Sequence, residues 1–179
     1  FGLVVDIIDC DWRGPADPTQ IEAILRADAG RQIKAVLATH NETATGVRSD
    51  LASIREAIDH AGSDALFFVD GVSSIASMDF QMDEWGIDAA VTGSQKGLML
   101  PAGLSIVALS QKAREAGQNA GLPRFFFDCE IMGAMTDAGG FPYTPPMQLL
   151  AGLSHSLELL LDEGLDPVFS RHFKMAEGV

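Results

Sequence analysis

Short apolar runs recur along the chain, separated by stretches in which apolar residues return every three or four positions. Strands buried in a parallel sheet are covered on both faces, so they show continuous apolar runs rather than alternation. The runs that fit such strands occupy residues 3–8, 33–39, 66–69, 89–91 and 104–109. The sequence therefore predicts a sheet of short strands.

Helical spacing fills most of the intervals between these runs. The predicted helices begin near Asp17, Ser49 or Asp50, Ser110, Pro145 and Asp166. Asp17 followed by Pro18 is typical of a helix start, because the acid caps the backbone and proline suits the first helical position. Residues 117–144 are rich in glycine and phenylalanine, and we expect them to be irregular apart from a short helix or strand near residues 125–129. Strands alternating with helices predict an α/β domain, a three-layer α/β/α sandwich with a mostly parallel sheet.

Composition narrows the class of protein. The formal charge of −13 over 179 residues argues against nucleic acid, whose phosphates would be repelled, and against an anionic membrane surface. No apolar run approaches the roughly 20 residues of a membrane helix, and no basic region precedes the first apolar run. The two cysteines, Cys10 and Cys129, suggest neither a disulfide framework nor a metal site. We expect a soluble protein of the cytoplasm, with no metal.

Two candidate chemical groups follow neighbouring strand candidates. Asp70 ends the run 66–69, and Lys96 follows the run 89–91 in the sequence Gly93-Ser94-Gln95-Lys96-Gly97. In open α/β sheets, ligands bind past the carboxyl ends of the strands. A lysine in dry, crowded surroundings loses its charge and becomes a nucleophile that forms Schiff bases with carbonyls. If the carbonyl is that of pyridoxal 5'-phosphate, the cofactor also needs a carboxylate at its pyridine nitrogen, and Asp70 is the candidate.

The residues alone leave other interpretations open. Asp70 could cap a helix, or bind magnesium after a buried strand as in nucleotide hydrolases, and Lys96 could be a solvated loop residue. A nucleotide hydrolase would need the pattern Gly-x-x-x-x-Gly-Lys-Ser/Thr, which the chain lacks.

Four motifs in a fixed order add a family resemblance. They are residues 39–47 (Thr-His-Asn-Glu-Thr-Ala-Thr-Gly-Val), 68–74 (Phe-Val-Asp-Gly-Val-Ser-Ser), 83–88 (Asp-Glu-Trp-Gly-Ile-Asp) and 93–101 (Gly-Ser-Gln-Lys-Gly-Leu-Met-Leu-Pro). Together they resemble the class V aminotransferases, in the serine–glyoxylate and alanine–glyoxylate branch, in register over nearly the whole chain. The resemblance implies an incomplete large domain of the pyridoxal-phosphate-dependent transferase fold type I. Residues 1–144 would be its central part, without its N-terminal portion, and residues 145–179 a long helix leading toward a small C-terminal domain.

The resemblance also implies roles for residues around the cofactor. Lys96 would form the Schiff base with pyridoxal 5'-phosphate, the internal aldimine, and would later move the proton between Cα and C4′. Asp70 would pair with the pyridine nitrogen. Val72 would lie near the ring, and Gln95 would reach the cofactor phosphate.

A second set of roles involves loops farther along the fold. Asn41 or Thr43 would place a hydrogen-bond donor near the phenolic oxygen of the cofactor, and the resemblance does not decide between them. We interpret Glu42 as structural, a residue that fixes their loop through backbone amides. Thr144, in the sequence Phe141-Pro-Tyr-Thr-Pro-Pro, would contact the phosphate of the neighbouring subunit's cofactor, which would make a homodimer part of the site.

The implied function is transfer of an amino group from serine or alanine to glyoxylate, by a ping-pong mechanism through the pyridoxamine form, with serine favoured. Alternatives are another class V chemistry such as cysteine desulfuration, although neither Cys10 nor Cys129 sits in a suitable motif, or a non-catalytic fragment. The second is open because the phosphate-binding glycine loop and the aromatic that stacks on the ring would precede Phe1. The arginine for the substrate carboxylate would follow Val179.

Overall fold

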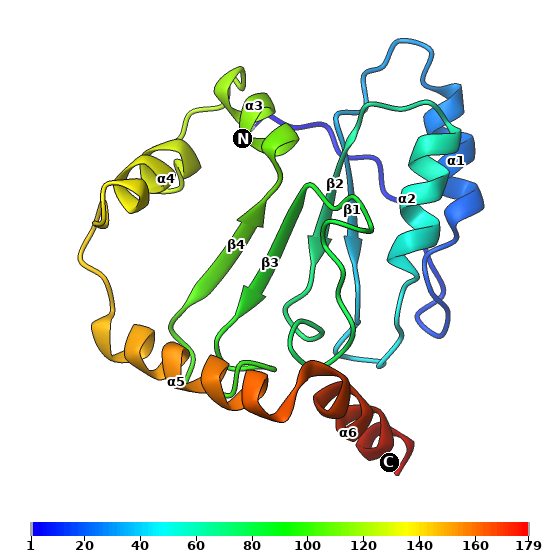
Figure 1. The fold of residues 1–179 in the computed structure, drawn as a ribbon. Helices are drawn as coiled ribbons and strands as arrows, with labels where there is room; N and C mark the ends of the chain where they lie inside the picture. Colours follow the sequence, from blue (N-terminus) through cyan, green and yellow to red (C-terminus); the bar gives the residue numbers. More distant parts are fainter. Residues whose placement is uncertain (1, 179) are drawn as a thin grey trace.

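The computed structural model describes residues 2–178, so the outermost residues of the two predicted segments, Phe1 and Val179, lie outside it. One sheet has the strand order β1-β2-β3-β4. Its strands are β1 (Ala35–Thr39), β2 (Leu66–Asp70), β3 (Ala89–Gly93) and β4 (Ser105–Leu109). The first three are parallel, and β4 runs antiparallel to β3 (Figure 1). The predicted α/β class with a mostly parallel sheet is confirmed.

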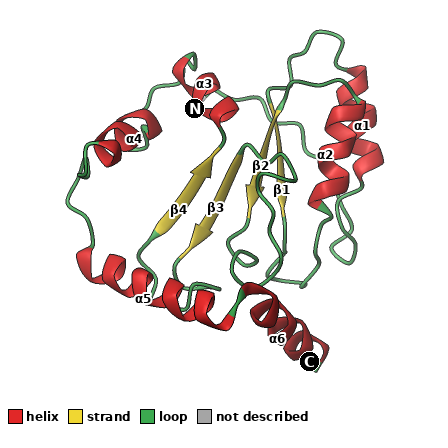
Figure 2. Ribbon diagram, viewed as in Figure 1, coloured by secondary structure: helices red, strands yellow, loops and turns green. Residues whose placement is uncertain are grey.

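Helices α1 (Pro18–Ala27) and α2 (Leu51–His60) cover one face of this sheet (Figure 2). Their buried side chains meet those of β2 and β3 in the main core, formed by Ile21, Leu25, Leu51, Ile54, Ile58, Phe67, Val69, Ile87 and Ala90. The remaining helices are α3 (Gln111–Gln118), α4 (Cys129–Asp137), α5 (Met147–Glu163) and α6 (Leu165–Glu177). No helix within residues 2–178 combines the length and apolarity needed to cross a membrane.

Helix starts follow the capping chemistry that the sequence predicts. The side chain of Asp17 accepts a hydrogen bond from the backbone N–H of Thr19 at 2.9 Å, just before Pro18. Asp50, rather than Ser49, caps α2, and its carboxylate accepts from the N–H of Ser53 at 3.1 Å. Each cap satisfies a donor that the first helical turn would otherwise leave without a partner.

The opposite face of the sheet is open. Side chains alternate across a strand, so Leu37, Phe68, Val91 and Val107 share this face through the strand register. Leu37 is 74% exposed and Val107 is 50% exposed. The three-layer prediction therefore holds for two layers only, because residues 2–178 supply helices to one face and leave the other without cover.

A predicted strand at the start of the chain does not form. Residues 3–8 are irregular, and Leu3, Val4, Val5 and Ile7 are all more than two-thirds exposed, with Val4 at 93%. A strand needs a neighbour for its backbone hydrogen bonds. No strand within the described residues lies beside this segment, so its high β-propensity finds no ladder to join.

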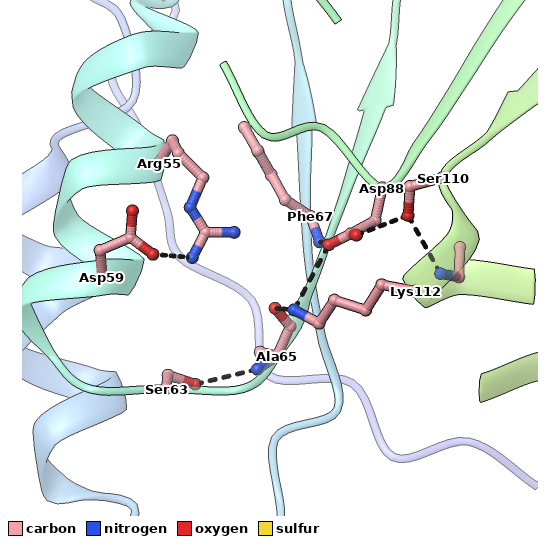
Figure 3. Close-up of polar contacts among 9 residues, drawn as sticks. Arg55, Asp59, Ser63, Ala65, Phe67, Asp88, Ser110 and Lys112 are labelled. Carbon is pink, nitrogen blue, oxygen red and sulfur yellow. Dashed lines mark hydrogen bonds and ion pairs between the residues drawn. The ribbon is translucent and has the colours of Figure 1, made fainter. Parts of the chain in front are cut away.

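A buried carboxylate ties the sheet together at the amino ends of β2 and β3 (Figure 3). Asp88 is 5% exposed, and its two oxygens accept from the backbone N–H of Phe67 at 2.9 Å and the hydroxyl of Ser110 at 2.7 Å. The ammonium of Lys112 lies 3.6 Å from the same carboxylate and donates to the carbonyl of Ala65 at 3.3 Å. Asp88 thus joins β2, β3 and the start of α3, far along the strands from the predicted site.

Removing this carboxylate is expected to cost stability. In Asp88→Ala, the buried N–H of Phe67 and the hydroxyl of Ser110 lose their acceptor, and Lys112 loses its ion pair and keeps only the carbonyl of Ala65. The free energy of unfolding should therefore fall by about 3 kcal/mol. Urea denaturation of the purified protein measures this change. Asp83→Ala, at an exposed position five residues earlier, is the control and should change stability by less than about 0.5 kcal/mol. Equal effects of both substitutions would show that Asp88 does not hold the strands.

Candidate active site

The turn after β2 presents Asp70. This residue ends the strand, lies on the open face of the sheet, and accepts a hydrogen bond from the N–H of Val72 at 2.9 Å through Oδ1. The N–H of Gly71 donates to the carbonyl of Val91 at 3.0 Å, which fastens the turn to β3. Asp70 also lines a shallow hollow of about 430 Å³ over this face, together with Leu37, Thr39, Phe68 and Val91 among others.

The loop after β3 presents Lys96. Ser94 is completely buried, and its hydroxyl donates to the carbonyl of Pro101 at 2.7 Å and accepts from the N–H of Leu104 at 3.1 Å. The N–H of Leu100 donates to the carbonyl of Ser94 at 3.0 Å. Ser94 therefore closes the loop from inside, and Lys96 lies on its exposed part.

These two loops are in direct contact. A Cβ atom at Gly97 would overlap the carbonyl oxygen of Ile75 and would lie 2.6 Å from the hydroxyl of Ser77, so only glycine allows the loops to approach this closely. Ala76 and Met99, one on each loop, have φ angles of +65° and +57°. Left-handed backbone at residues with side chains is unfavourable and is concentrated at functional sites. The structure therefore brings the predicted acid and the predicted amine onto adjoining loops.

The dry surroundings that would make Lys96 a nucleophile are not found within the described residues. Asp70, Gln95 and Lys96 are all exposed. The physical reason is the open face of the sheet, because no segment of residues 2–178 covers the carboxyl ends of β2 and β3 from that side. Within residues 2–178, the acid and the amine are therefore open to solvent.

The loop after β1 is tied to the loop that carries Asp70. The side-chain amide of Asn41 donates to the hydroxyl of Ser73 at 2.9 Å, and this hydroxyl donates to the carbonyl of Asn41 at 2.7 Å. The carboxylate of Glu42 accepts from the N–H of Ala44 at 2.9 Å, which confirms the predicted structural role of Glu42. Thr43 is exposed, and its hydroxyl makes no hydrogen bond within residues 2–178. Asn41 is thus engaged within the protein, whereas Thr43 is free to meet a ligand.

The predicted roles of Val72 and Thr144 toward the cofactor stay predictions. Val72 is half-buried in the turn after Asp70. Thr144 is exposed just before α5, and within the described residues it makes no hydrogen bond to either loop. The structural roles of Ser73 and Ser94 were not predicted, because a serine beside a strand end has no pattern that distinguishes a buried tie from a solvated loop residue.

His40 follows β1 and is packed in an aromatic cluster beside the site. Its ring lies 5.6 Å from that of Phe80 and 5.8 Å from that of Trp85, and its Nδ1 is buried without a partner. Its backbone N–H donates to the carbonyl of Asp70 at 2.9 Å. Burial, helped by the nearby charge of Arg48 and opposed by Asp79, lowers the pKa of His40 to about 4.

This pKa predicts a loss of stability in mild acid. The unfolded chain protonates His40 near its ordinary pKa of 6.5, whereas the folded protein resists until about pH 4. Stability from the neutral imidazole is therefore complete above pH 6.5 and is lost as the pH falls toward 4, by about 2–3 kcal/mol. Thermal unfolding across this range measures the loss. His40→Phe should flatten the profile, whereas His155→Gln, at an exposed position, should not; an unchanged profile in His40→Phe would contradict the assignment.

Comparison with known proteins gives a consistent family. The family model of the class-V aminotransferases matches residues 1–177. The chain is 56% identical over 178 residues to L-aspartate–glyoxylate aminotransferase of Paracoccus denitrificans and 51% identical over 182 residues to serine–glyoxylate aminotransferase of Methylorubrum extorquens. Both alignments cover 99% of this chain and 45% of the relative, so the chain spans less than half the length of these relatives.

Solved structures agree with the sequence comparison. The crystal structure of an alanine–glyoxylate aminotransferase from Nostoc sp. matches with a TM-score of 0.85 and 28% identity, over 95% of this chain and 45% of that one. An aspartate aminotransferase from Thermus thermophilus matches with a TM-score of 0.80 and 29% identity, over 94% of this chain and 45% of that one. The half-covered sheet described above is therefore similar to part of a larger fold in these structures.

Proposed function

The chain belongs to the class-V aminotransferase family, and we propose that it carries the central part of a pyridoxal-phosphate-dependent aminotransferase site that transfers amino groups to glyoxylate. The observation that carries this proposal is the position of Asp70 and Lys96 on two contacting loops, past the ends of the neighbouring parallel strands β2 and β3. An acid and an amine on contacting loops at such strand ends match the needs of one flat, charged cofactor.

The two side chains are free to hold this cofactor. Within residues 2–178, the amine of Lys96 makes no hydrogen bond or ion pair, and Oδ2 of Asp70 has no partner because only Oδ1 accepts from Val72. When bound, pyridoxal phosphate supplies an electron sink that allows a proton to leave and return at the α carbon of an amino acid. Lys96 would hold the cofactor carbonyl carbon covalently and then, once displaced, carry the proton at the α carbon. Asp70 would keep the proton on the pyridine nitrogen.

Three further residues would orient the ring. Val72 would support it from the turn that Asp70 begins, and Gln95 would reach the phosphate from the position beside Lys96. Thr43 would donate to the phenolic oxygen, since the amide of Asn41 is already bonded to Ser73. Asn41 would then act through the loop, as the tie that holds Thr43 beside the turn of Asp70.

The site would be completed by a second copy of the chain. Phe125 and Phe127 are each 80% exposed, Phe141 is 52% exposed, and the ring of Phe126 stacks on Tyr143 at 4.5 Å. Exposed aromatic groups gathered in one segment mark protein–protein contact surfaces. Thr144 follows directly, so a homodimer formed through this segment would carry its hydroxyl to the cofactor phosphate of the neighbouring subunit.

Glyoxylate is the acceptor named for all of the relatives reported by sequence above, whereas their donors differ. The sequence favours serine or alanine; the aspartate enzyme of Paracoccus denitrificans adds a third donor that was not anticipated. We propose a small amino acid as donor, with serine first.

Half-reactions test this choice. The purified, cofactor-loaded protein is mixed with serine, alanine or aspartate, and loss of the visible band of the bound cofactor is followed. Serine should react at least about tenfold faster than aspartate, and glyoxylate should restore the band. A faster reaction with aspartate would contradict the choice of serine as donor. The absence of a reaction with all three amino acids would contradict the aminotransferase proposal itself.

A further inference from the structure

Helix α5 runs across the end of the sheet toward which β1, β2 and β3 point, beside the loop of Lys96 (Figure 1). Ser156 is a polar side chain on this helix and is only 5% exposed. Its hydroxyl donates to the backbone carbonyl of Leu98, two residues after Lys96 and 58 positions away in the sequence. A buried hydroxyl on a leucine-rich helix thus binds the loop that carries the predicted nucleophile.

Close packing accompanies this hydrogen bond. Leu98 is buried in a small core with Leu160 of α5 and Val168 of α6. A Cβ atom at Gly152, one turn before Ser156, would lie only 2.8 Å from Leu100. The helix therefore contacts the loop on both sides of the hydrogen bond and leaves it little room to move.

The loop held in this way has an unfavourable backbone. Met99 has a φ of +57°, a conformation that a residue with a side chain keeps only where its surroundings fix it. The N–H of Met99 donates to the carbonyl of Lys96 at 2.9 Å, so the unfavourable turn begins at Lys96 itself. Relaxation of this turn would move the backbone from which the amine projects.

We propose that Ser156 is a positioning residue for Lys96, which holds the turn 96–99 in its strained form and thereby directs the amine toward the cofactor carbonyl. This inference rests on the proposed function for the role of the amine. The hold on the loop, however, is a property of the chain itself and can be measured without cofactor.

The experiment compares Ser156→Ala with Ser154→Ala in the purified protein. Ser154 is exposed on the same helix, so it is the matched control. In the cofactor-free protein, amide hydrogen exchange of residues 97–100 should be about tenfold faster in Ser156→Ala and unchanged in Ser154→Ala. Formation of a borohydride-reducible adduct between Lys96 and added pyridoxal phosphate should slow by a similar factor, about tenfold, in Ser156→Ala alone.

Rescue separates positioning from a general loss of stability. Adding Met99→Gly to Ser156→Ala should restore much of the adduct rate, because glycine adopts a positive φ without strain. A merely structural defect would not be repaired at this position. If Ser156→Ala does not fold, Ser156→Cys replaces it, since a thiol is a weaker donor of similar shape and should give an intermediate rate.

Two results overturn the inference. The first is an amide exchange rate and an adduct rate in Ser156→Ala or Ser156→Cys that both equal those of the unsubstituted protein. The second is a change in Ser154→Ala, in both rates, as large as that in Ser156→Ala. If the unsubstituted protein forms no adduct at Lys96, the proposed function fails, while the exchange measurement still decides whether Ser156 holds the loop.

Discussion

Replacing Lys96 by alanine is expected to abolish amino transfer. The amine is exposed, free of hydrogen bonds and ion pairs within residues 2–178, and carried by a loop closed around Ser94. Its loss would remove both the covalent hold on the cofactor and the proton carrier at the α carbon, so turnover should fall by about 10⁴-fold or more. Steady-state assay with serine and glyoxylate measures the loss, and the absorption spectrum should lose the band of the covalently held cofactor.

The control for this substitution is Lys174→Ala. Lys174 lies in the last turn of α6 and has no part in the proposed chemistry, so its replacement should leave turnover within about twofold of the original, within the range of a neutral surface change. The free energy of unfolding should be nearly the same in both variants, because neither amine is buried. A Lys96→Ala protein that keeps a tenth or more of the activity would contradict the assignment.

Replacing Asp70 by asparagine is expected to have the second largest effect on turnover. The amide oxygen can still accept from the N–H of Val72 as Oδ1 does now, so the turn should survive and only the negative charge should go. Without that charge the pyridine nitrogen binds its proton less tightly, and the ring withdraws fewer electrons from the α carbon. Turnover should fall by about 10²–10³-fold, the range for removal of one electrostatic partner at a reacting centre.

Measurements on this variant should separate charge from structure. The melting temperature of Asp70→Asn should match that of the original protein. Its rate of deuteron removal from serine deuterated at the α carbon should fall. Asp79→Asn, an exposed substitution farther along the same connection, should have no such effect. Equal rates for Asp70→Asn and the original protein would mean that the carboxylate does not face the cofactor.

Local chemistry made much of this fold predictable. The capping acids Asp17 and Asp50 and the buried run before Asp70 each act within a few residues, and the structure forms the helices and the strand that they predict. The two candidate groups were also predictable, since right-handed crossovers place the ends of successive parallel strands at one edge of a sheet. The loops that carry these two groups meet at Gly97.

Features that depend on distant parts of the chain were not predictable in this way. Residues 3–8 have strong strand character but no neighbour within the described residues, so the strand is absent. The exposure of Lys96 depends on what covers the open face, which no local pattern encodes. No local pattern in the leucine-rich sequence of α5 marks Ser156. Only the packing of α5 on the loop of Leu98, 58 residues earlier, shows what its hydroxyl does.

We expect a covalent bond between the amine of Lys96 and the cofactor, with Asp70 facing the same cofactor. The most direct test is to reduce the cofactor-loaded protein with borohydride, digest it, and locate the phosphopyridoxyl group by mass spectrometry. We expect one label per chain, on the peptide that contains Lys96. A label spread over Lys34, Lys112 and Lys174, or no label at all, would contradict it.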